Sequence, residues 1–528
     1  MVDCVKILEC KLSRAKRTTL LAGWVFCAMF DFYHRPSSAF CRLPAIGFAV
    51  LLLFTTLNAQ PVVRDITVVG NTRTRSDILV RELLFQSGES LDTLKIAETE
   101  RNLRRLYFLG NIFIETVLDG SFADITVHVT DLYARAISPI LGGNADELSY
   151  GFTALDYNLL GRGQIAQVTL AHDAVSGNRG RIFYRNPRIN GSRLALTSDL
   201  GLADEGHHVA LSLNQSFNTL ATAWAYGLIV HTRENVQRLY RSGRLVEKYT
   251  DLTSGGSLWL TRSYGQSIKT RPGLQVSVTD QTFKAEPGYA YAPGSRRRIL
   301  ASFSLSLWKP HYEKQVFVRQ LGRTEDLQTG SSVSTRIGVS TKALGSDDNY
   351  LFYALQIAPR FKPTPNSFVF ANLSLGGRHQ GGIYANLDLR ADGSLYARFL
   401  QIHTLALRAR YDALLRPEDT GQLLLGLFRG LRGYGPRRFD GSRRYTLNLE
   451  ARPTLYRTGA FVVGGTVFVD AGDAWTPGQA GPAFNSSAGA GLRLATSHVY
   501  DQPILRSDLA YGFRDRSWQI SLGLDHYF

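Results

Sequence analysis

Alternation of apolar and polar residues, recurring from about residue 133 to the last residue, is the feature that most constrains the fold. In three segments the residues of one face are apolar and those of the other are mostly polar: 193–202, 300–308 and 405–411. A period of two is the signature of a strand with one apolar and one polar face. Gly, Asn, Asp and Pro turns separate such stretches, as in a membrane barrel with a lipid-facing exterior and a polar lumen. A sheet that spans a membrane must close, because hydrocarbon cannot satisfy open edges.

A soluble β-sandwich also alternates, and three observations weigh against it. The segment 133–528 is 396 residues long, too long for one sandwich. The chain is rich in aromatic residues, and its first 60 residues are expected to direct export. It also ends on an alternating segment that places Trp518, Ile520, Leu522, Leu524 and Phe528 on one face. An amphipathic last strand that closes on Phe resembles the signal that bacterial outer-membrane barrels present to their assembly machine.

The first 60 residues are interpreted as a signal peptide with an over-extended N-terminus. The apolar run 45–57 is too short to span a bilayer as a helix, basic residues precede it, and Ala59 is a suitable cleavage position. A buried core helix is the alternative, but no polar face accompanies the run. All four cysteines and both methionines lie before the expected cut: Cys4, Cys10, Cys27, Cys41, Met1 and Met29. The exported chain is therefore expected to contain no sulfur, which excludes a disulfide scaffold and a zinc site with Cys ligands.

Residues 61–132 predict a small α/β domain of order β-α-α-β-β. The strand 62–69 ends at a Gly-Asn turn. One helix is expected from Ser76 through Phe85 and a second from Asp92, and strands are expected at 112–118 and 124–129. The segments 70–92 (GNTRTRSDILVRELLFQSGESLD) and 102–118 (NLRRLYFLGNIFIETVL) resemble a POTRA domain. The resemblance implies a non-catalytic periplasmic module that binds extended peptide at a sheet edge. A plain structural spacer is the alternative.

Several segments of 133–528 resemble the BamA/TamA superfamily of outer-membrane assembly proteins, also called the bacterial surface antigen family. They are 158–163 (NLLGRG), 183–187 (FYRNP), 431–434 (LRGY), 468–472 (FVDAG) and 489–494 (GAGLRL). The family implies a mainly β protein, in which a transmembrane antiparallel barrel of sixteen strands follows one POTRA domain. Sixteen strands would leave about 25 residues for each strand and turn, which suits tilted strands and long outer loops.

The candidate site is the LRGY motif, Leu431, Arg432, Gly433 and Tyr434, which resembles the tip of a loop that folds back into the lumen. A guanidinium inside a lumen requires an anionic partner and offers a planar fork of donors. By the same resemblance Asp470, followed by Gly472, supplies that partner on the wall. Glu450 and Arg452 are a second candidate pair. The alternative is an ordinary loop arginine in solvent.

No cofactor, metal site or enzyme activity is expected. The motifs H-E-x-x-H, G-x-S-x-G and Walker A do not occur, and the adjacent His207 and His208 lack metal-ligand spacing. The whole chain carries a formal charge of +16, of which +12 remains after residues 1–60. No aromatic-basic nucleic-acid module accompanies this charge, so we assign it to lumen and outer-loop arginines.

The resemblance implies insertion, assembly or translocation of proteins at the bacterial outer membrane, with the POTRA domain in the periplasm. The expected partners are the lipid bilayer, unfolded client proteins at the POTRA edge and at a seam between the first and last strands, and periplasmic proteins or lipoproteins. The single POTRA domain departs from the several of the central assembly protein and favours a narrower role. A substrate-specific pore of two-partner secretion and a structural surface antigen remain alternatives. Depletion of the protein distinguishes the three functions.

Overall fold

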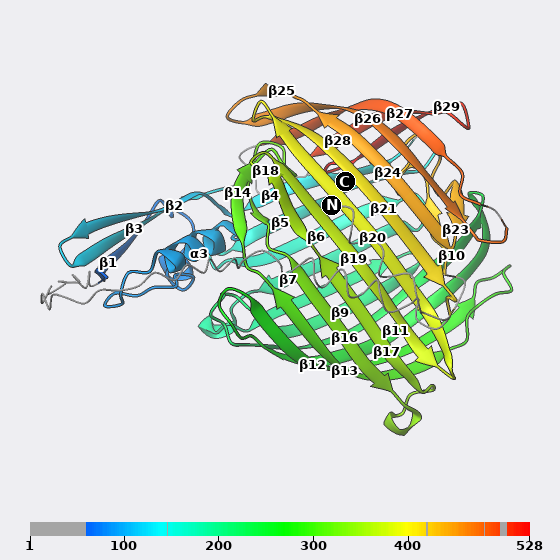
Figure 1. The fold of residues 1–528 in the computed structure, drawn as a ribbon, viewed down its shortest axis with the longest axis horizontal. Helices are drawn as coiled ribbons and strands as arrows, with labels where there is room; N and C mark the ends of the chain where they lie inside the picture. The colour runs from blue at the N-terminus through cyan, green and yellow to red at the C-terminus, as the bar shows by residue number, and fades with distance from the viewer. Residues whose placement is uncertain (1–59, 145, 419–420, 480, 497–503) are drawn as a thin grey trace, which may run out of the picture. The chain divides into compact units, whose positions relative to one another are not determined.

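The computed structural model describes residues 60–144, 146–418, 421–479, 481–496 and 504–528 (Figure 1). The expected signal peptide therefore lies outside the described residues, apart from Gln60. None of the helices among the described residues is long and apolar enough to span a bilayer.

The small N-terminal domain has the predicted order of strands and helices. Its elements are β1 (Val62–Val69), α2 (Ser76–Val80), α3 (Thr93–Arg104), β2 (Leu109–Asp119) and β3 (Phe122–Asp131). The sheet order is β1-β3-β2, with β1 parallel and β2 antiparallel to the central strand β3. Asp92 caps α3 by accepting the Leu94 amide at 2.8 Å.

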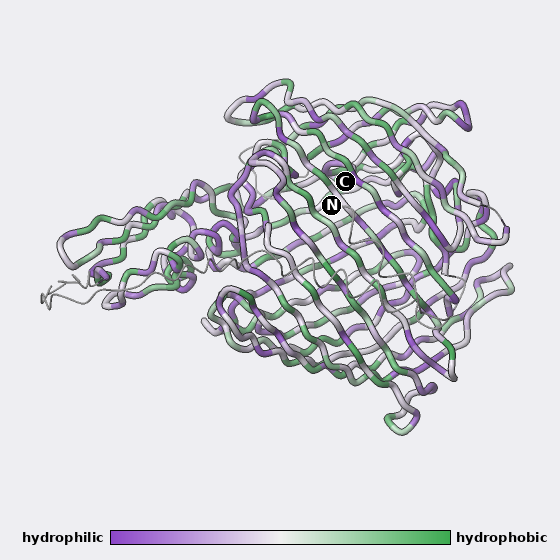
Figure 2. Tube along the Cα trace, viewed as in Figure 1, coloured by the Kyte–Doolittle hydropathy of each residue, from purple (hydrophilic) through white to green (hydrophobic). Residues whose placement is uncertain are grey.

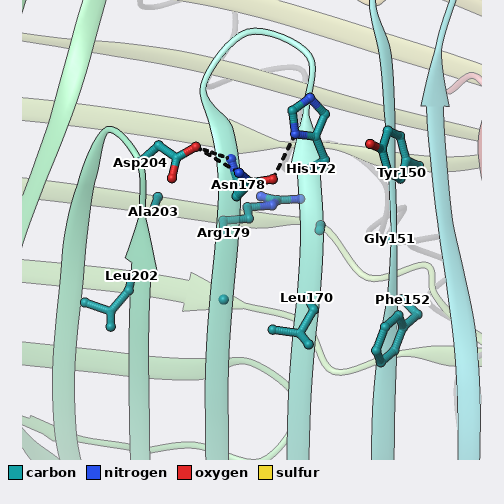
Figure 3. A pocket seen from close by; sticks show the side chains of 12 residues that line it. Tyr150, Gly151, Phe152, Leu170, His172, Asn178, Arg179, Leu202, Ala203 and Asp204 are labelled. Atoms are coloured by element: carbon teal, nitrogen blue, oxygen red, sulfur yellow. Dashed lines mark hydrogen bonds between the residues drawn. The ribbon is translucent and has the colours of Figure 1, made fainter.

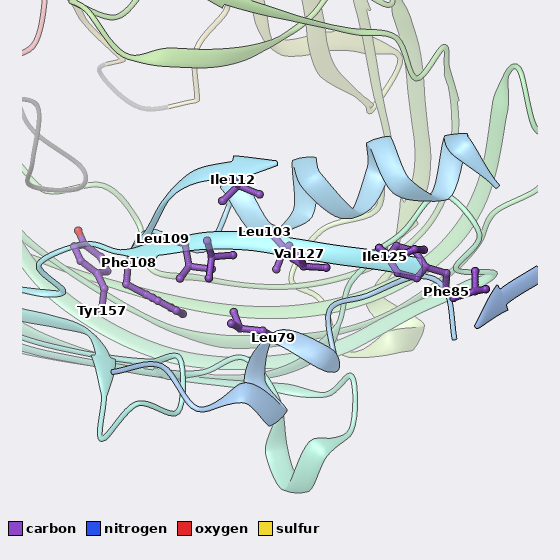
Figure 4. Packing of buried hydrophobic residues seen from close by; sticks show 11 residues of the cluster. Leu79, Phe85, Leu103, Phe108, Leu109, Ile112, Ile125, Val127 and Tyr157 are labelled. Atoms are coloured by element: carbon purple, nitrogen blue, oxygen red, sulfur yellow. The ribbon is translucent and has the colours of Figure 1, made fainter. Parts of the chain in front are cut away.

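The apolar core of this domain lies between the helices and the sheet (Figure 4). The buried residues come from β1, the two helices and the segments that follow them, β2, β3 and the barrel strand β5 (Leu148–Leu159): Val63, Leu79, Phe85, Leu103, Phe108, Leu109, Ile112, Ile125, Val127, Val129 and Tyr157. The first helix is shorter than the predicted 76–85. After Val80 the chain tightens into i→i+3 hydrogen bonds, and the Leu84 amide donates to Thr99 of α3.

A closed antiparallel barrel follows (Figure 1). Its first strands are β4 (Arg135–Gly143), β5 (Leu148–Leu159), β6 (Gln164–Asp173), β7 (Gly177–Asn186), β8 (Ala195–Ala203), β9 (Gly206–Gln215), β10 (Trp224–Arg241), β11 (Arg244–Arg262), β12 (Lys269–Ala285) and β13 (Arg296–Trp308). The remaining wall strands are β16 (Ser332–Ser340), β17 (Tyr350–Ala358), β18 (Arg360–Thr364), β19 (Ser367–Gln380), β20 (Ile383–Phe399), β21 (His403–Leu415), β24 (Arg443–Arg452), β25 (Thr454–Arg457), β26 (Phe461–Trp475), β27 (Asn485–Thr496), β28 (Leu505–Gly512) and β29 (Ser517–Leu524). Short 3-10 turns occur at Ile189–Gly191 and Lys342–Leu344.

The predicted count of sixteen strands is wrong. The described wall has twenty strands when β17 with β18, and β24 with β25, are each counted as one interrupted strand. Strand β18 continues β17 beyond Pro359, and both pair with β19. Strand β25 likewise continues β24 beyond Pro453, and both pair with β26. Each proline interrupts the ladder because it lacks an N–H. The expected average of 25 residues for each strand and turn was too high, because several hairpin turns are tight, as at Ser242-Gly243 and Gly381-Gly382.

The alternation predicted from the sequence separates an apolar exterior from a polar lumen. On β13, Phe303 and Leu307 are exposed while Ser302 is buried; on β21, Leu405 and Leu407 are exposed while Ala406 is buried. Figure 2 shows the same alternation of apolar and polar residues along the wall strands. A band of exposed leucine, isoleucine, valine and aromatic side chains suits lipid contact.

Two insertions interrupt this regular wall. We call the end at which β4 begins and β29 ends the proximal end, and the opposite end the distal end. At the proximal end, residues 309–331 carry a two-stranded sheet, β14 (Tyr312–Val316) and β15 (Thr324–Gln328). At the distal end, the loop between β21 and β24 carries β22 (Leu423–Leu425) and β23 (Phe439–Gly441).

Candidate functional site

The loop between β21 and β24, here the lumen loop, turns inward from the distal end and packs against the inner face of the wall. Its apolar residues form a buried cluster with Ala474 of β26: Leu425, Leu431, Tyr434 and Phe439. Leu431 and Tyr434 have no exposed surface. This small core anchors the loop and holds the predicted LRGY motif inside the lumen.

The structure brings Arg432 and Asp470 together. The guanidinium donates from Nε to Oδ2 and from Nη2 to Oδ1, each at 2.8 Å, and the Arg432 amide also donates to Oδ2 at 3.2 Å. Nη1 donates to Oε1 of Glu450 at 2.5 Å. All three side chains are fully buried. The forked contact fixes the orientation of the loop tip because both guanidinium edges hold a carboxylate.

Two aromatic rings enclose the same guanidinium. Its central carbon lies 3.4 Å from the ring centre of Phe468 and 4.2 Å from that of Tyr527. A cation held against aromatic faces gains further attraction when it is removed from water. Arg432 is therefore held by the wall strands β24 and β26 and by the end of the chain.

A wider buried network surrounds this centre. Arg452 donates to Glu450 at 2.7 Å, as the second predicted pair requires. Arg493 donates to Asp508 at 2.7 Å, and a second arginine, Arg506, lies 3.4 Å from the same carboxylate. Pairing of this kind offsets the large cost of removing charges from water. Sequence reasoning missed Arg493 and Asp508, although both occupy inward positions of the alternating last strands.

Glycines in the predicted motifs lie where the loop and wall approach most closely. A Cβ on Gly433 would stand 2.5 Å from Ser487 Cβ and 2.7 Å from the Gly512 amide nitrogen. A Cβ on Gly472 would stand 2.7 Å from a main-chain oxygen of β24. Tyr434, next to Gly433, donates its hydroxyl to the Ser486 carbonyl at 2.9 Å. Glycine permits these contacts because it has no side chain.

The last residues do not continue the terminal strand, which corrects the prediction that Phe528 shares its face. Trp518 and Ile520 are exposed on the outer surface, and Leu522 and Leu524 are half-buried. Strand β29 ends at Leu524, and Asp525 has a φ of 64°. This left-handed residue turns the chain inward, so that Phe528 packs against a lumen cluster.

Tyr527, which sequence reasoning also missed, connects these last residues to the lumen loop. Its hydroxyl donates to the Leu427 carbonyl at 2.7 Å and accepts from the Gly430 amide at 2.8 Å. Arg452 donates to the main-chain oxygen of Phe528 at 2.8 Å. An alternating strand extrapolated through residue 528 gives no signal for this turn. We call residues 525–528 the tail.

The seam between the first and last strands is the weakest joint of the wall. The described residues of β29 pair with β4 only through Leu522 and Gly143, whereas β29 pairs with β28 at eight positions. The Asn144 side chain reaches Gln519 at 3.5 Å across the seam. Most of the hydrogen-bonding groups on the free edge of β4 therefore have no ladder partner in β29.

An outward-facing groove lies on strands β5 to β8 (Figure 3). Exposed Phe152, Leu170 and Leu202 line its apolar part, while Asn178 hydrogen-bonds Asp204 and His172 at its polar rim. The apolar part faces outward with the lipid-contacting side chains, so we assign no chemistry to it. Among the described residues no group of three or more His, Cys, Asp or Glu side chains is arranged to hold a metal ion.

Comparisons with known proteins address the two parts of the chain. The POTRA family model, described as "Surface antigen variable number repeat", matches residues 61–131. The chain is 25% identical over 126 residues to the outer membrane protein assembly factor BamA of Neorickettsia risticii, covering 23% of this chain and 17% of that protein. It is 23% identical over 149 residues to BamA of Nitratidesulfovibrio vulgaris, covering 27% of this chain and 18% of that protein. The matches span less than a fifth of these curated relatives.

Two solved structures resemble the chain over 88% of its length. One is BamA from Haemophilus ducreyi lacking POTRA domains 1-3, with 15% sequence identity, 85% of that chain covered and a TM-score of 0.42. The other is CdiB from Acinetobacter baumannii, with 13% sequence identity, 74% of that chain covered and a TM-score of 0.47. At these TM-scores the likeness carries no argument about this chain.

Proposed function

We propose that this chain, which the POTRA match and the BamA relatives place in the BamA/TamA-type superfamily, inserts or translocates proteins at the bacterial outer membrane. The barrel spans the membrane, and the N-terminal domain lies in the periplasm. The proposed role is non-catalytic. The observation that carries the proposal is the seam, where one residue pair joins two strands of an otherwise continuous wall.

An unpaired strand edge is a template for another strand. The free edge of β4 offers N–H and C=O groups that only an added strand can satisfy within a bilayer. Pro139 lies within β4, and proline is tolerated in sheets mainly at edge strands. A client strand entering the seam would therefore complete hydrogen bonds that β29 leaves open.

The N-terminal sheet offers a second edge for clients. Strand β2 is an outer strand of the order β1-β3-β2, and Phe113, Val117 and Leu118 on it are exposed. An extended peptide adds to such an edge through its main chain while side-chain contacts supply selectivity. We propose that clients bind here before they reach the seam, and that periplasmic proteins or lipoproteins assist.

A reversible closure of the seam tests this function. Asn144 and Gln519 face each other across the joint, so Asn144→Cys with Gln519→Cys allows a disulfide, or a short thiol cross-linker that itself contains a cleavable disulfide, to join the two strands reversibly. The cross-linked protein in lipid vesicles should fail to insert an unfolded outer-membrane barrel into protease-protected form, and reductant should restore insertion. The matched control is Leu505→Cys with Leu524→Cys, at a paired position of β28 and β29, where cross-linking should change nothing. Equal insertion by the locked and released seam would contradict the proposal.

Depletion in cells separates the proposed role from the two alternatives. Loss of many barrel proteins from the outer membrane is the expected result for insertion. Loss of one secreted protein would indicate a dedicated pore, and no change in either would indicate a structural surface protein. Photo-reactive residues placed along β4 would identify the trapped polypeptides directly.

A further inference from the structure

The insertion at the proximal end, residues 309–331, turns inward and lies against the inner face of the barrel wall. We call it the strap. It leaves the wall between β13 and β16, beside β18 in Figure 1. Val318 and Leu327 of the strap are buried against Phe368, Tyr396 and Ala406, which lie on the inner faces of β19, β20 and β21. These residues form an apolar patch on the inner wall, separate from the cluster that anchors the lumen loop.

The strap makes further contacts with wall strands beyond this cluster. Thr404 of β21 donates to the Phe317 carbonyl, and the guanidinium of Arg457 in β25 lies over the Phe317 ring. Leu321 reaches β26, where its two terminal methyl carbons lie 3.4 Å from the position of a Cβ on Gly464. The strap also pairs Glu313 with Lys362 of β18, so its contacts run over neighbouring wall strands from β18 to β26.

The tip of the strap holds its own shape. The largely buried carboxylate of Glu325 accepts hydrogen bonds from the main-chain amides of Val318, Arg319 and Gln320 at 3.1, 2.8 and 3.3 Å. These three hydrogen bonds lie within the strap and do not depend on the wall. A segment with internal hydrogen bonds of this kind can move without losing its form.

The strap is joined to the wall through short, distinct connections. Pro310 follows β13, and Gly330 precedes β16. The two strands of the strap pair only with each other, over five positions, and an isolated two-stranded sheet is marginally stable by itself. Its closed position therefore depends on the apolar cluster and on contacts at its rim.

One rim contact leads to the N-terminal domain. Asp326 of the strap accepts two hydrogen bonds from Arg104 of α3, at 2.9 and 3.0 Å. The guanidinium of Arg101, also in α3, lies 4.5 Å from the ring centre of Tyr312. The tail lies on another side, because Phe528 packs against the same apolar cluster as Val318. The strap thus touches the N-terminal domain, to which the proposed function assigns client binding, and the tail that follows the seam strand β29.

We propose that the strap is a gate of the proximal mouth of the lumen. In the structure it is closed, with Val318 and Leu327 seated on the wall. It opens by swinging about Pro310 and Gly330 as a preformed unit, which frees the inner faces of β19 to β26 for a passing polypeptide. This inference goes beyond the proposed function, because a gate of the lumen is measurable without any client.

Ion conductance of the full protein in planar lipid bilayers tests the gate. Leu327→Ser weakens the apolar seat and should raise the mean conductance several-fold. Gln320→Ser is the matched control. The Gln320 side chain is exposed at the strap tip, and only the main-chain N–H of this residue donates to Glu325. This variant should conduct as the wild type does. Conductance of Leu327→Ser equal to that of the control would overturn the proposal.

A reversible lock guards against misfolding of the weakened variant. Residues 60–528 contain no cysteine, so Leu321→Cys with Gly464→Cys adds the one cysteine pair of that part of the chain, for a disulfide or for a short cross-linker that contains a cleavable disulfide. In the Leu327→Ser background, cross-linking should return the conductance to the wild-type level and reductant should raise it again. A pair that fails to cross-link, or a cross-link without effect, would also overturn the gate. These outcomes are independent of whether the protein inserts clients.

Discussion

Replacing Arg432 by methionine removes the charge at the centre of the lumen while keeping most of the side-chain volume. The guanidinium makes two hydrogen bonds to Asp470 at 2.8 Å and one to Glu450 at 2.5 Å, with no exposure to solvent. Loss of one partner of a buried ion pair costs about 3–5 kcal/mol, because the remaining charge stays buried without compensation. We therefore expect Arg432→Met to lower the free energy of unfolding by an amount in this range.

The value should lie toward the lower end of that range, about 3 kcal/mol, because each carboxylate keeps another donor. Asn448 still donates to Asp470 at 2.7 Å, and Arg452 still donates to Glu450 at 2.7 Å. The measurement is urea unfolding of the purified protein in detergent or vesicles, followed by tryptophan fluorescence. Resistance to unfolding on gels, compared with and without heating, provides a second readout.

The double variant Arg432→Met with Asp470→Asn decides whether the two residues act as a pair. Its free energy of unfolding should fall by at least about 1 kcal/mol less than the sum of the falls in the two single variants, as expected for residues in contact. Arg408→Met is the control: Arg408 contacts Asp392 at 2.7 Å, but both side chains are over a quarter exposed, so the expected loss is at most about 1 kcal/mol. Additive losses in the double variant, or an Arg432→Met loss no larger than that of the control, would refute the reasoning.

Two further predictions concern the loop tip and the N-terminal sheet. Gly433→Ala forces a methyl group into the inner wall, where main-chain atoms stand within 3 Å, and should destabilise the barrel by about 1–3 kcal/mol; urea unfolding measures it, and a wild-type midpoint would contradict it. In the N-terminal domain, a hydrogen bond from Arg64 lowers the pKa of Asp124 below its usual value. The resulting stabilisation is present above the unfolded pKa of about 3.9 and is lost as the pH falls through the lower folded value. Hydrogen exchange in β1 and β3, corrected for intrinsic rates, should show this loss in the wild type and much less of it in Arg64→Gln.

Much of the fold followed from local patterns. Alternation located wall strands such as β13 and β21, because the two faces of a strand in a membrane barrel meet different solvents. The cap at Asp92 and the turn at Gly70 located elements of the N-terminal domain. The strand count did not follow, because only the lengths of hairpin turns decide how many strands a given length of chain supplies.

The candidate site was predictable only in part. Arg432 and Asp470 lie in short motifs, so a resemblance could pair them. Arg493 lies within the segment 489–494, but the resemblance gave it no partner, and Asp508 and Tyr527 lie outside the quoted segments. Asp508 and Tyr527 meet Arg432 only after the barrel closes and the tail turns inward. The strap was equally hidden, since a sequence does not show whether an insertion lies outside the barrel or against its inner wall.

The seam also bears on the order of folding. Its two strands are the first and the last of the wall, and the contact between Asn144 and Gln519 joins residues 375 positions apart. Contacts of long sequence separation form late, because the loop-closure entropy must be lost before any contact is gained. A joint with one ladder pair offsets little of that entropy loss by itself. An ion pair from Arg437 of the lumen loop to Glu147, in the turn after β4, further stabilises the closed seam. Closure of the ring is therefore expected to be the slowest step and to await the seating of the lumen loop.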